Sequence, residues 1–476
     1  MLLKRIFERR KILSLFLICI LSRVITNISY YEDIDSLRFG LSAIDFNVLE
    51  SRPHFPGYAI YCFILQNVFN LTNDIGIATS SIGGISIFLI ILYSIKLFKL
   101  FKLSDFEYMV LILFLNPFIW IMSNRYMPDL FGLSLLIICF YYLIRIIKFN
   151  EIKDFLIFGI IIGIQCGVRL SYVPFFLPAL FLIFNVKVMY SILGFLISTG
   201  AWLIPLVYIT GYENFLEIFK NDTHGHFYKW GGTILSSESS LKIRLYNLIE
   251  YVFVDGFSFW AKNRNWTTII NSIFILVFFV SFFKKVFFKR KLKNIKLETV
   301  ITFLCFLSYF IWVLLFQNIN YKPRHIMPFI PLIAFMLNEG IRSLSDVKTN
   351  RAILLILFLL PNIYITSNLV IQHKKESALS QIKTFLDEEE HKKVVVFSDG
   401  LKIFYLDNTL RNKNIKLLNL NKRNYEQLKK FIDLDYKIYS SMKLNELSNF
   451  ELEEYFFFHN PHVNRLWSQL KLYKYE

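Results

Sequence analysis

The sequence predicts an α-helical protein that crosses a membrane many times and ends in a small α/β domain outside it. Of its 476 residues, 55% are hydrophobic and the mean hydropathy is +0.46, more than a soluble protein of this length can cover with polar residues. The apolar residues form uncharged runs as long as the hydrocarbon core is thick, for example 352–370. From 371 onward, short apolar runs alternate with polar segments instead.

The net charge of +17 is distributed in a way that indicates a membrane rather than nucleic acid. Basic residues gather in short clusters between apolar runs, at 4–11, 96–102 and 284–296. Such clusters are typical of the cytoplasmic ends of spanning helices, where they also touch anionic lipid. We therefore expect membrane lipid as a partner and no nucleic acid.

The apolar pattern predicts about eleven or twelve spanning helices. They lie near 12–29, 75–95, 106–123, 127–147, 155–169, 172–186, 188–209, 267–284, 298–317, 325–340 and 351–370. The basic cluster at 284–296 is the strongest orientation signal, and we place it in the cytoplasm. This choice puts 30–55, the long loop 210–266 and the tail after 370 on the outer side.

One apolar stretch, 55–71, does not fit this count as an ordinary span. If it crossed, the cluster at 96–102 would lie outside, or every later loop would change sides. We therefore predict that 55–71 lies along the outer interface or enters the membrane and returns.

The tail predicts a small α/β domain at 371–476, after a membrane domain at 1–370. The runs 394–399, 415–420 and 436–441 are typical of strands, and 425–432 and 444–450 of helices. Strands that alternate with helices favour a partly parallel sheet. Because the tail carries no glycine-rich phosphate loop, we expect it to serve as a cap or packing platform.

The segment after the first helix holds three carboxylates within four positions, Glu32, Asp33 and Asp35. Mutual repulsion and partial burial raise the pKa of at least one member of such a cluster. A carboxylate of this kind can take a proton from an attacking hydroxyl, or the cluster can hold a divalent cation, Mg or Mn, against a phosphate. The alternative is a solvated acidic loop.

Further polar side chains stand at the predicted outer ends of other helices. They are His54, Arg125, Asp129, Arg169, Arg324 and His325. Charges at such places are costly unless they are paired or used, and arginines facing carboxylates would suit a phosphate-bearing ligand. Each arginine taken singly is equally well explained as an anchor to lipid headgroups.

The loop 221–232 combines His224 and His226 with aromatic residues and three glycines. Aromatic faces beside polar groups suit sugar rings, which favours an acceptor-side or lid loop. Two histidines with Asp222 form only a weak metal signature, because the spacing does not single them out as ligands. An ordinary interfacial loop rich in aromatics is the alternative.

These motifs together resemble the GT-C superfamily of membrane glycosyltransferases. The resemblance rests on the acidic cluster after the first helix, the Asp-Ser pair at 35–36 and PHFPGY at 53–58. It is closest to the protein O-mannosyltransferase-like branch, where an HPPGY-type motif follows an Asp-Ser; here Phe55 replaces a proline. Arg169 and the segment PRHIMP at 323–328 also fit this family, and the likeness covers about 1–340.

The resemblance implies a transferase that uses a polyprenyl-phosphate-linked sugar on the periplasmic or lumenal face. An Asp in the first outer loop would act as base, and Arg or Lys would hold the leaving phosphate. Asp35 is the first choice for the base and Asp33 the second, while Glu32 would orient the site or bind metal. His54 would bind substrate or brace its loop. The acceptor could be a lipid, a glycan or a protein.

Two other functions also fit a chain with many helices. A transporter or lipid flippase should show paired charges near the membrane midplane and an internal repeat, neither of which the sequence shows. A non-catalytic scaffold would bind partners through its tail. The abundance of Lys, Asn, Ile and Phe favours a bacterial inner membrane over an endoplasmic reticulum.

Overall fold

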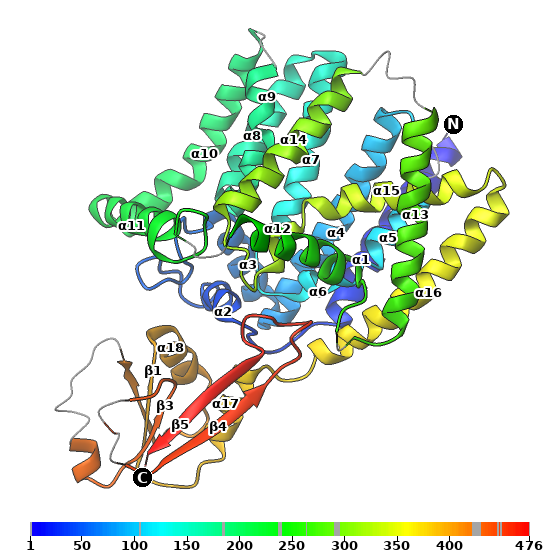
Figure 1. Ribbon diagram of the computed structural model, residues 1–476. Coiled ribbons are helices and arrows are strands. Elements are labelled where there is room, and N and C mark those ends of the chain that lie inside the picture. Colours follow the sequence, from blue (N-terminus) through cyan, green and yellow to red (C-terminus); the bar gives the residue numbers. More distant parts are fainter. Residues whose placement is uncertain are drawn as a thin grey trace.

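The computed structural model shows a bundle of helices with a five-stranded sheet at one end (Figure 1). It describes residues 2–103, 106–182, 186–236, 240–262, 264–289, 296–420, 430–444, 447 and 450–475. The first helices are α1 (Leu2–Ile25), α2 (Ile34–Leu41), α3 (Ala59–Thr72), α4 (Ile75–Leu100), α5 (Glu107–Phe114), α6 (Pro117–Asn124), α7 (Asp129–Phe149) and α8 (Ile152–Arg169).

The second half of the bundle follows a 3-10 segment. It contains η1 (Leu170–Phe176), α9 (Leu177–Leu182), α10 (Val188–Thr210), α11 (Tyr212–His224), η2 (Gly225–Lys229), α12 (Leu241–Glu250), η3 (Tyr251–Asp255), α13 (Thr267–Lys289), α14 (Leu297–Phe316), η5 (Pro323–Ile326), α15 (Phe329–Leu344) and α16 (Lys348–His373).

The bundle has two distinct ends. At one end, Lys148 Nζ at the end of α7 lies 2.7 Å from the carbonyl oxygen of Leu100 in α4 and 3.3 Å from Glu298 in α14. The charge rule predicts that this end, where the basic cluster 96–102 lies, faces the cytoplasm. The opposite end, called the outer end on this prediction, carries α2, α11, α12 and the sheet (Figure 1).

Within the described residues, seven helical runs are long and apolar enough to cross a membrane, and the pair α5–α6, bent by 52°, makes an eighth. The chain is therefore an integral, multi-pass membrane protein. The predicted eleven or twelve spans exceed this number because α15 has only 16 residues and α1 carries charges at both ends. The run 152–181 also counts once, although it corresponds to two predicted segments.

The chain reverses direction inside that run, at Arg169. The backbone of Arg169 leaves the helical region (φ −155°, ψ 82°), and the rings of Phe158 and Phe176 lie 5.8 Å apart. In one continuous helix these residues would be separated by about 27 Å along the axis. Arg169 thus stands at the outer tip of a hairpin formed by α8 with η1 and α9.

The apolar stretch 55–71 lies at the same end of the bundle as the acidic loop. It forms α3, whose 14 residues span only about 21 Å, less than the hydrocarbon core. Tyr58, just before α3, contacts Arg169 at the outer tip of α8. Just after α3, the backbone of Gly76 approaches the carbonyl oxygen of Ile28, which follows α1. Both ends of α3 are therefore on the outer side.

The tail forms a mixed sheet with strand order β2-β1-β3-β5-β4. After α17 (Ala378–Asp387), its elements are β1 (Val394–Ser398), α18 (Gly400–Thr409), β2 (Ile415–Asn419), β3 (Lys437–Ser440), β4 (Leu452–Phe458) and β5 (Gln469–Tyr475). The first three strands are parallel to one another, which confirms the three predicted strands and the partly parallel sheet. The antiparallel hairpin of β4 and β5 was not predicted.

Two predicted helices of the tail fall largely on residues that the structure does not describe. The one at 425–432 overlaps 421–429, and the one at 444–450 overlaps 445–446 and 448–449.

The tail packs against the loop that follows α1. Tyr31 lies 5.4 Å from Tyr126 and 5.2 Å from Tyr405 of α18, ring centroid to ring centroid. These tyrosines share one apolar cluster with Leu379 of α17 and Val396 of β1. The sheet is thus fixed next to the acidic loop.

Candidate active site at the outer end of the bundle

Asp33 begins the helix that presents Asp35. Its carboxylate accepts hydrogen bonds from the backbone amides of Asp35 (3.1 Å) and Ser36 (2.8 Å), and the Ser36 hydroxyl accepts one from the Asp33 amide. This reciprocal cap fixes the start of α2. Burial raises the pKa of Asp33, so that this member of the cluster is the one shifted upward.

Asp35 is buried within a group of three cations. One carboxylate oxygen lies 2.6 Å from Arg324 and 3.4 Å from Lys322 Nζ, and the other lies 3.2 Å from Arg38. Burial acts to raise the pKa of Asp35, but the positive charges of Arg324 and Lys322 outweigh it and hold that pKa well below its usual range. Asp35 is therefore ionised in the ligand-free protein.

A chain of polar groups runs from Arg324 across the outer end of the bundle. Arg324 Nε lies 3.8 Å from Asp129, and the same carboxylate oxygen lies 2.9 Å from Arg169. Arg169 donates to the Tyr58 hydroxyl (3.2 Å), which lies 3.3 Å from Nε2 of His54. The network thus joins residues from α2, α7, the tip of α8, the loop before α3 and η5.

This network is buried but not saturated with hydrogen bonds. Among the described residues, Asp129 meets Arg169 and Arg324 as ion pairs without hydrogen-bond geometry, and Nε of both arginines donates no hydrogen bond. Buried polar atoms normally have partners. Buried guanidinium groups with unused donors suit an anion with several oxygens, such as phosphate.

The two histidines of this region are electrically neutral. Burial lowers the pKa of His54 well below its usual value, and the charge of Arg38 adds to this effect. The pKa of His325 is likewise lowered by burial and by Arg324. The backbone of His325 is held by the Tyr309 hydroxyl, which donates to its carbonyl oxygen at 2.9 Å. Neither imidazole adds positive charge to the site.

Glu32 belongs to a separate cluster. Arg125 donates to both of its carboxylate oxygens, at 3.1 and 3.2 Å, and His373 at the end of α16 lies 2.9 Å from one of them. The tail completes the cluster: Arg125 donates to the Val463 carbonyl oxygen, and Asn464 donates to that of Glu32. Burial acts to raise the pKa of Glu32, but the neighbouring cations lower it to about 2.

The segment 221–232 is not the predicted loop, because α11 continues to His224 and η2 follows it. It borders the network, since burial and the charges of Lys322 and Arg169 lower the pKa of His226. His226 makes a 2.9 Å hydrogen bond with the Phe316 carbonyl oxygen, and His224 packs against the Tyr228 ring. Among the described residues, no three His, Cys, Asp or Glu side chains are placed to hold a metal ion. The earlier part of α11 covers the proline-rich turn, through ring contacts of Phe55 with Phe215 and Phe219.

Three residues near Asp35 were not singled out from the sequence. Lys322 and Arg38 contact Asp35 directly, and Tyr58 connects Arg169 with His54. Each stands within a few positions of a residue that was singled out: Lys322 is two residues before Arg324, and Arg38 is three residues after Asp35. Their proximity in sequence was the available signal.

Comparison with known proteins supports the fold. No protein-family model and no curated protein matches the chain. A crystal structure of ArnT from Cupriavidus metallidurans bound to undecaprenyl phosphate is similar, with a TM-score of 0.60, 9% identity and 97% of each chain covered. The apo form of the same protein is similar with a TM-score of 0.60 and 10% identity, covering 99% of this chain and 98% of that chain.

These similarities extend over almost the whole chain. The expected fold, a helical membrane domain followed by a small C-terminal α/β region, is therefore confirmed, and it is ArnT-like. The O-mannosyltransferase-like branch stays a prediction, and the identity is low enough that the likeness shows the fold alone.

Proposed function

We propose that this protein is a glycosyltransferase that moves a sugar from a polyprenyl-phosphate-linked donor to an acceptor hydroxyl on the outer face of the membrane. The observation that carries the proposal is the buried, unsaturated chain Asp35–Arg324–Asp129–Arg169 at the outer end of a GT-C fold. A similar solved structure is bound to undecaprenyl phosphate, which supports a lipid phosphate as the natural occupant of such a fold.

The arginines supply the phosphate site in this proposal. Arg169 and Arg324 present unused donors to the same buried region, and Lys322 stands at its edge. The departing lipid phosphate gains negative charge as its bond to the sugar breaks, so that cations fixed beforehand stabilise the transition state more than the donor itself.

Asp35 is the proposed base. When the donor phosphate draws Arg324 and Lys322 toward itself, Asp35 loses the two charges that hold its pKa down, and burial then raises that pKa. The carboxylate can now accept the acceptor's hydroxyl proton while the hydroxyl oxygen attacks the anomeric carbon. The sugar–phosphate bond breaks on the opposite side, and the sugar inverts.

The remaining residues take supporting roles. Asp33 positions Asp35 by capping α2, and Glu32 with Arg125 fixes the loop to the tail. His54 braces Tyr58 and, through it, Arg169. We place His224 and His226 on the acceptor side, next to the helix that covers the proline-rich turn. The acceptor is a lipid, a glycan or a protein, and the membrane is proposed to be a bacterial inner membrane.

A divalent cation, Mg or Mn, does not fit the carboxylates in this arrangement. Asp35 and Asp129 each lie against an arginine, and no group of three metal-ligating side chains forms within the described residues. We infer that arginine charge takes the place of a cation beside the phosphate.

The phosphate position is the direct test. A photoreactive undecaprenyl-phosphate analogue, incubated with the protein in lipid nanodiscs, should cross-link to peptides that contain Arg169 and Arg324. Cross-linking confined to the Arg125 region would contradict the assignment. Lipid translocation in vesicles without any sugar transfer would favour a flippase instead.

A further inference from the structure

The loop between β4 and β5 reaches from the sheet to the bundle and closes a hollow there (Figure 1). The wall combines His462 and Arg465 of this loop with Asp255 of η3, Arg264 before α13 and apolar residues of α6 and α16. None of the residues that form the network around Asp35 lines it. The hollow measures about 20 Å³, so it admits a single oxyanion group and not a sugar ring.

Arg264 is a partly buried cation without a counterion. Its Nη1 donates to the Val254 carbonyl oxygen at 2.7 Å, and its Nε donates to Nδ1 of His462 at 3.3 Å. Among the described residues it forms no ion pair with a carboxylate. Burial lowers the pKa of Arg264 to about 10, which leaves the side chain charged at neutral pH. A charge withdrawn from water in this way is costly until an anion neutralises it.

The carboxylate of the hollow, Asp255, is already bound by the second guanidinium group. Arg465 donates to its two oxygens at 3.1 and 2.8 Å, and donates to Glu250 at 3.0 Å from outside the hollow. Nη1 of Arg465 and Nη2 of Arg264 donate to none of the described residues. Two guanidinium groups with unused terminal donors beside one hollow suit the oxygens of a phosphate group.

His462 adds a third donor. A guanidinium group can only donate, so Nδ1 of His462 accepts the bond from Arg264 and the ring proton is on Nε2. Burial and the charges of Arg264 and Arg465 lower the pKa of His462 to about 4, which keeps the ring neutral and this tautomer in place. Within the described residues, the Nε2–H group has no acceptor.

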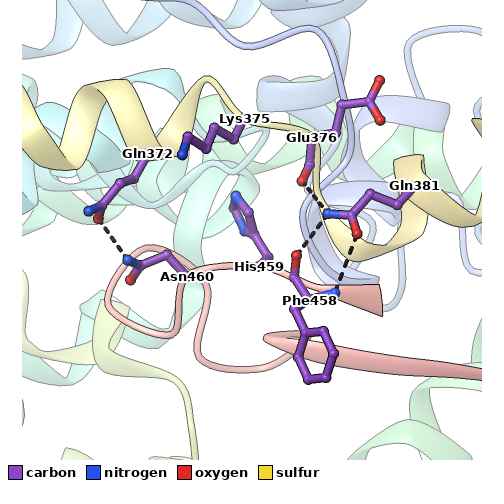
Figure 2. A pocket seen from close by; sticks show the side chains of 7 residues that line it. All are labelled: Gln372, Lys375, Glu376, Gln381, Phe458, His459 and Asn460. Atoms are coloured by element: carbon purple, nitrogen blue, oxygen red, sulfur yellow. Dashed lines mark hydrogen bonds between the residues drawn. The ribbon is translucent and has the colours of Figure 1, made fainter. Parts of the chain in front are cut away.

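The loop that carries His462 and Arg465 is held in position without a ligand. Figure 2 shows its start, where Asn460 donates to the Gln372 side-chain oxygen at 2.7 Å. The other end of the same amide accepts from the backbone N–H of His462 at 2.8 Å, and Asn464 donates to the Glu32 carbonyl oxygen at 2.6 Å. Donors that are fixed beforehand lose little freedom when a ligand binds.

We propose that this hollow is a second anion site, separate from the site of sugar transfer, and that it binds a phosphate group. Arg264 and Arg465 donate to the phosphate oxygens, and Nε2 of His462 donates to one more. A lipid headgroup and a soluble phosphate present the same oxygens. Binding here needs neither a polyprenyl donor nor transfer, so that the proposal stands or falls separately from the proposed function.

The test uses the full-length protein in dodecyl maltoside, labelled with ¹⁵N-histidine, with the His462 signal identified by its absence from His462→Gln. Inorganic phosphate, titrated with no donor present, should shift this signal to saturation. Arg264→Gln should weaken the affinity by about tenfold or more, the effect of losing a charge-assisted hydrogen bond. Lys262→Gln, an exposed cation two residues earlier, should bind within twofold of the wild type.

A parallel titration with dihexanoyl phosphatidate identifies the source of the phosphate. Saturation at a concentration tenfold below that of inorganic phosphate would indicate a lipid headgroup, and equal affinities would indicate a soluble phosphate.

The absence of a saturable shift in the wild-type protein would overturn the proposal, and this outcome does not depend on the folding of any variant. An equal shift with sodium chloride would also overturn it, because chloride would then act only by screening charge. So would wild-type affinity in Arg264→Gln. A response that is lost in Arg169→Gln but kept in Arg264→Gln would place the phosphate in the transfer site instead.

Discussion

Glu32 and Asp35 stand three residues apart, and both are buried carboxylates that face arginines, yet their surroundings differ. Glu32 is bound by Arg125 through two hydrogen bonds and lies against His373, and all three are nearly inaccessible to solvent. Asp35 is held by Lys322 and Arg38, whose side chains are 20% and 28% exposed, and by Arg324, which it shares with Asp129.

The difference separates a structural cluster from a binding cluster. A buried ionic network stabilises a fold when every member is satisfied. Glu32 and Arg125 meet that condition, because Arg125 bonds both carboxylate oxygens and the tail supplies it with a further acceptor. His373 Nε2 lies 2.9 Å from Glu32 without hydrogen-bond geometry. The network around Asp35 keeps unused donors. These donors destabilise the ligand-free protein, and they form hydrogen bonds when an anion binds. Each prediction below tests this distinction.

Asp35→Asn should have the largest effect on activity. Loss of a general base lowers the rate by about 10²–10⁴-fold, measured as sugar release from a radiolabelled polyprenyl-phosphate donor. The melting temperature should change little, because Arg324 retains its ion pair with Asp129 and the side chains of Lys322 and Arg38 reach solvent. Glu50→Gln, an exposed carboxylate in the same loop, is the control. Activity within threefold of the wild type would refute the base assignment.

Glu32→Gln should act on stability instead. It leaves the Arg125 guanidinium buried without its counterion, which costs about 3–5 kcal/mol. Denaturant unfolding in detergent measures this loss, and protein that remains folded should bind donor normally. If Glu32→Gln were as stable as the wild type but inactive, the assigned roles of Glu32 and Asp35 would have to be exchanged.

The pH dependence of the unfolding free energy should also report on Glu32. The pKa of Glu32 is lowered to about 2 in the folded protein from a usual value near 4.5. Its stabilising effect is therefore complete above pH 4.5 and is lost as the pH falls through 2, a change of about 3 kcal/mol. The difference in unfolding free energy between wild type and Glu32→Gln should shrink over this range. A constant difference would show that Glu32 is not the titrating group.

Arg324→Lys should have a moderate effect. The charge beside Asp35 remains, but the planar fork that can hold two phosphate oxygens is lost. We expect the KM for the donor to rise about tenfold, with a smaller change in kcat. Arg351→Lys, on the cytoplasmic side at the start of α16, is the matched control. A change in kcat alone would mean that Arg324 does not contact the donor before the reaction.

Removal of divalent cations should have the smallest effect. Because arginines occupy the positions beside Asp35 and Asp129, transfer measured in EDTA should stay within twofold of that in Mg²⁺ or Mn²⁺. A loss of activity that either ion restores would show that a cation enters with the substrate.

The sequence predicted those parts of the fold that depend on local pattern. Apolar runs located the spanning helices, the charge rule kept 55–71 at the outer side, and short apolar runs located β1, β2 and β3. The hairpin of β4 and β5 was missed although β4 ends in a continuous aromatic run, YFFF at 455–458. Along β5, QLKLYKY, apolar and charged residues alternate without such a run. The cap at Asp33 had a readable signal, a serine three residues later.

The division of labour between carboxylates depends on distant contacts and could not be read from the sequence. Asp35 meets Arg324 across 289 positions, and Arg125 meets Val463 across 338. Spacing within the acidic cluster contains no information about which carboxylate each arginine selects. Their positions at helix ends indicated that these charged side chains are paired or belong to a site. Only the packing of the tail distinguishes Glu32 from Asp35.

The bond from Asn464 to Glu32 closes a loop of 432 residues, and this has a consequence for biosynthesis. Glu32 leaves the ribosome early and must wait for nearly the whole chain to be made before its last partner exists. The helices can insert one after another in the meantime, so assembly of this corner comes last. A chain cut short before β4 would therefore cross the bilayer but lack a fully bonded acidic loop. The protein can become functional only after its translation is complete.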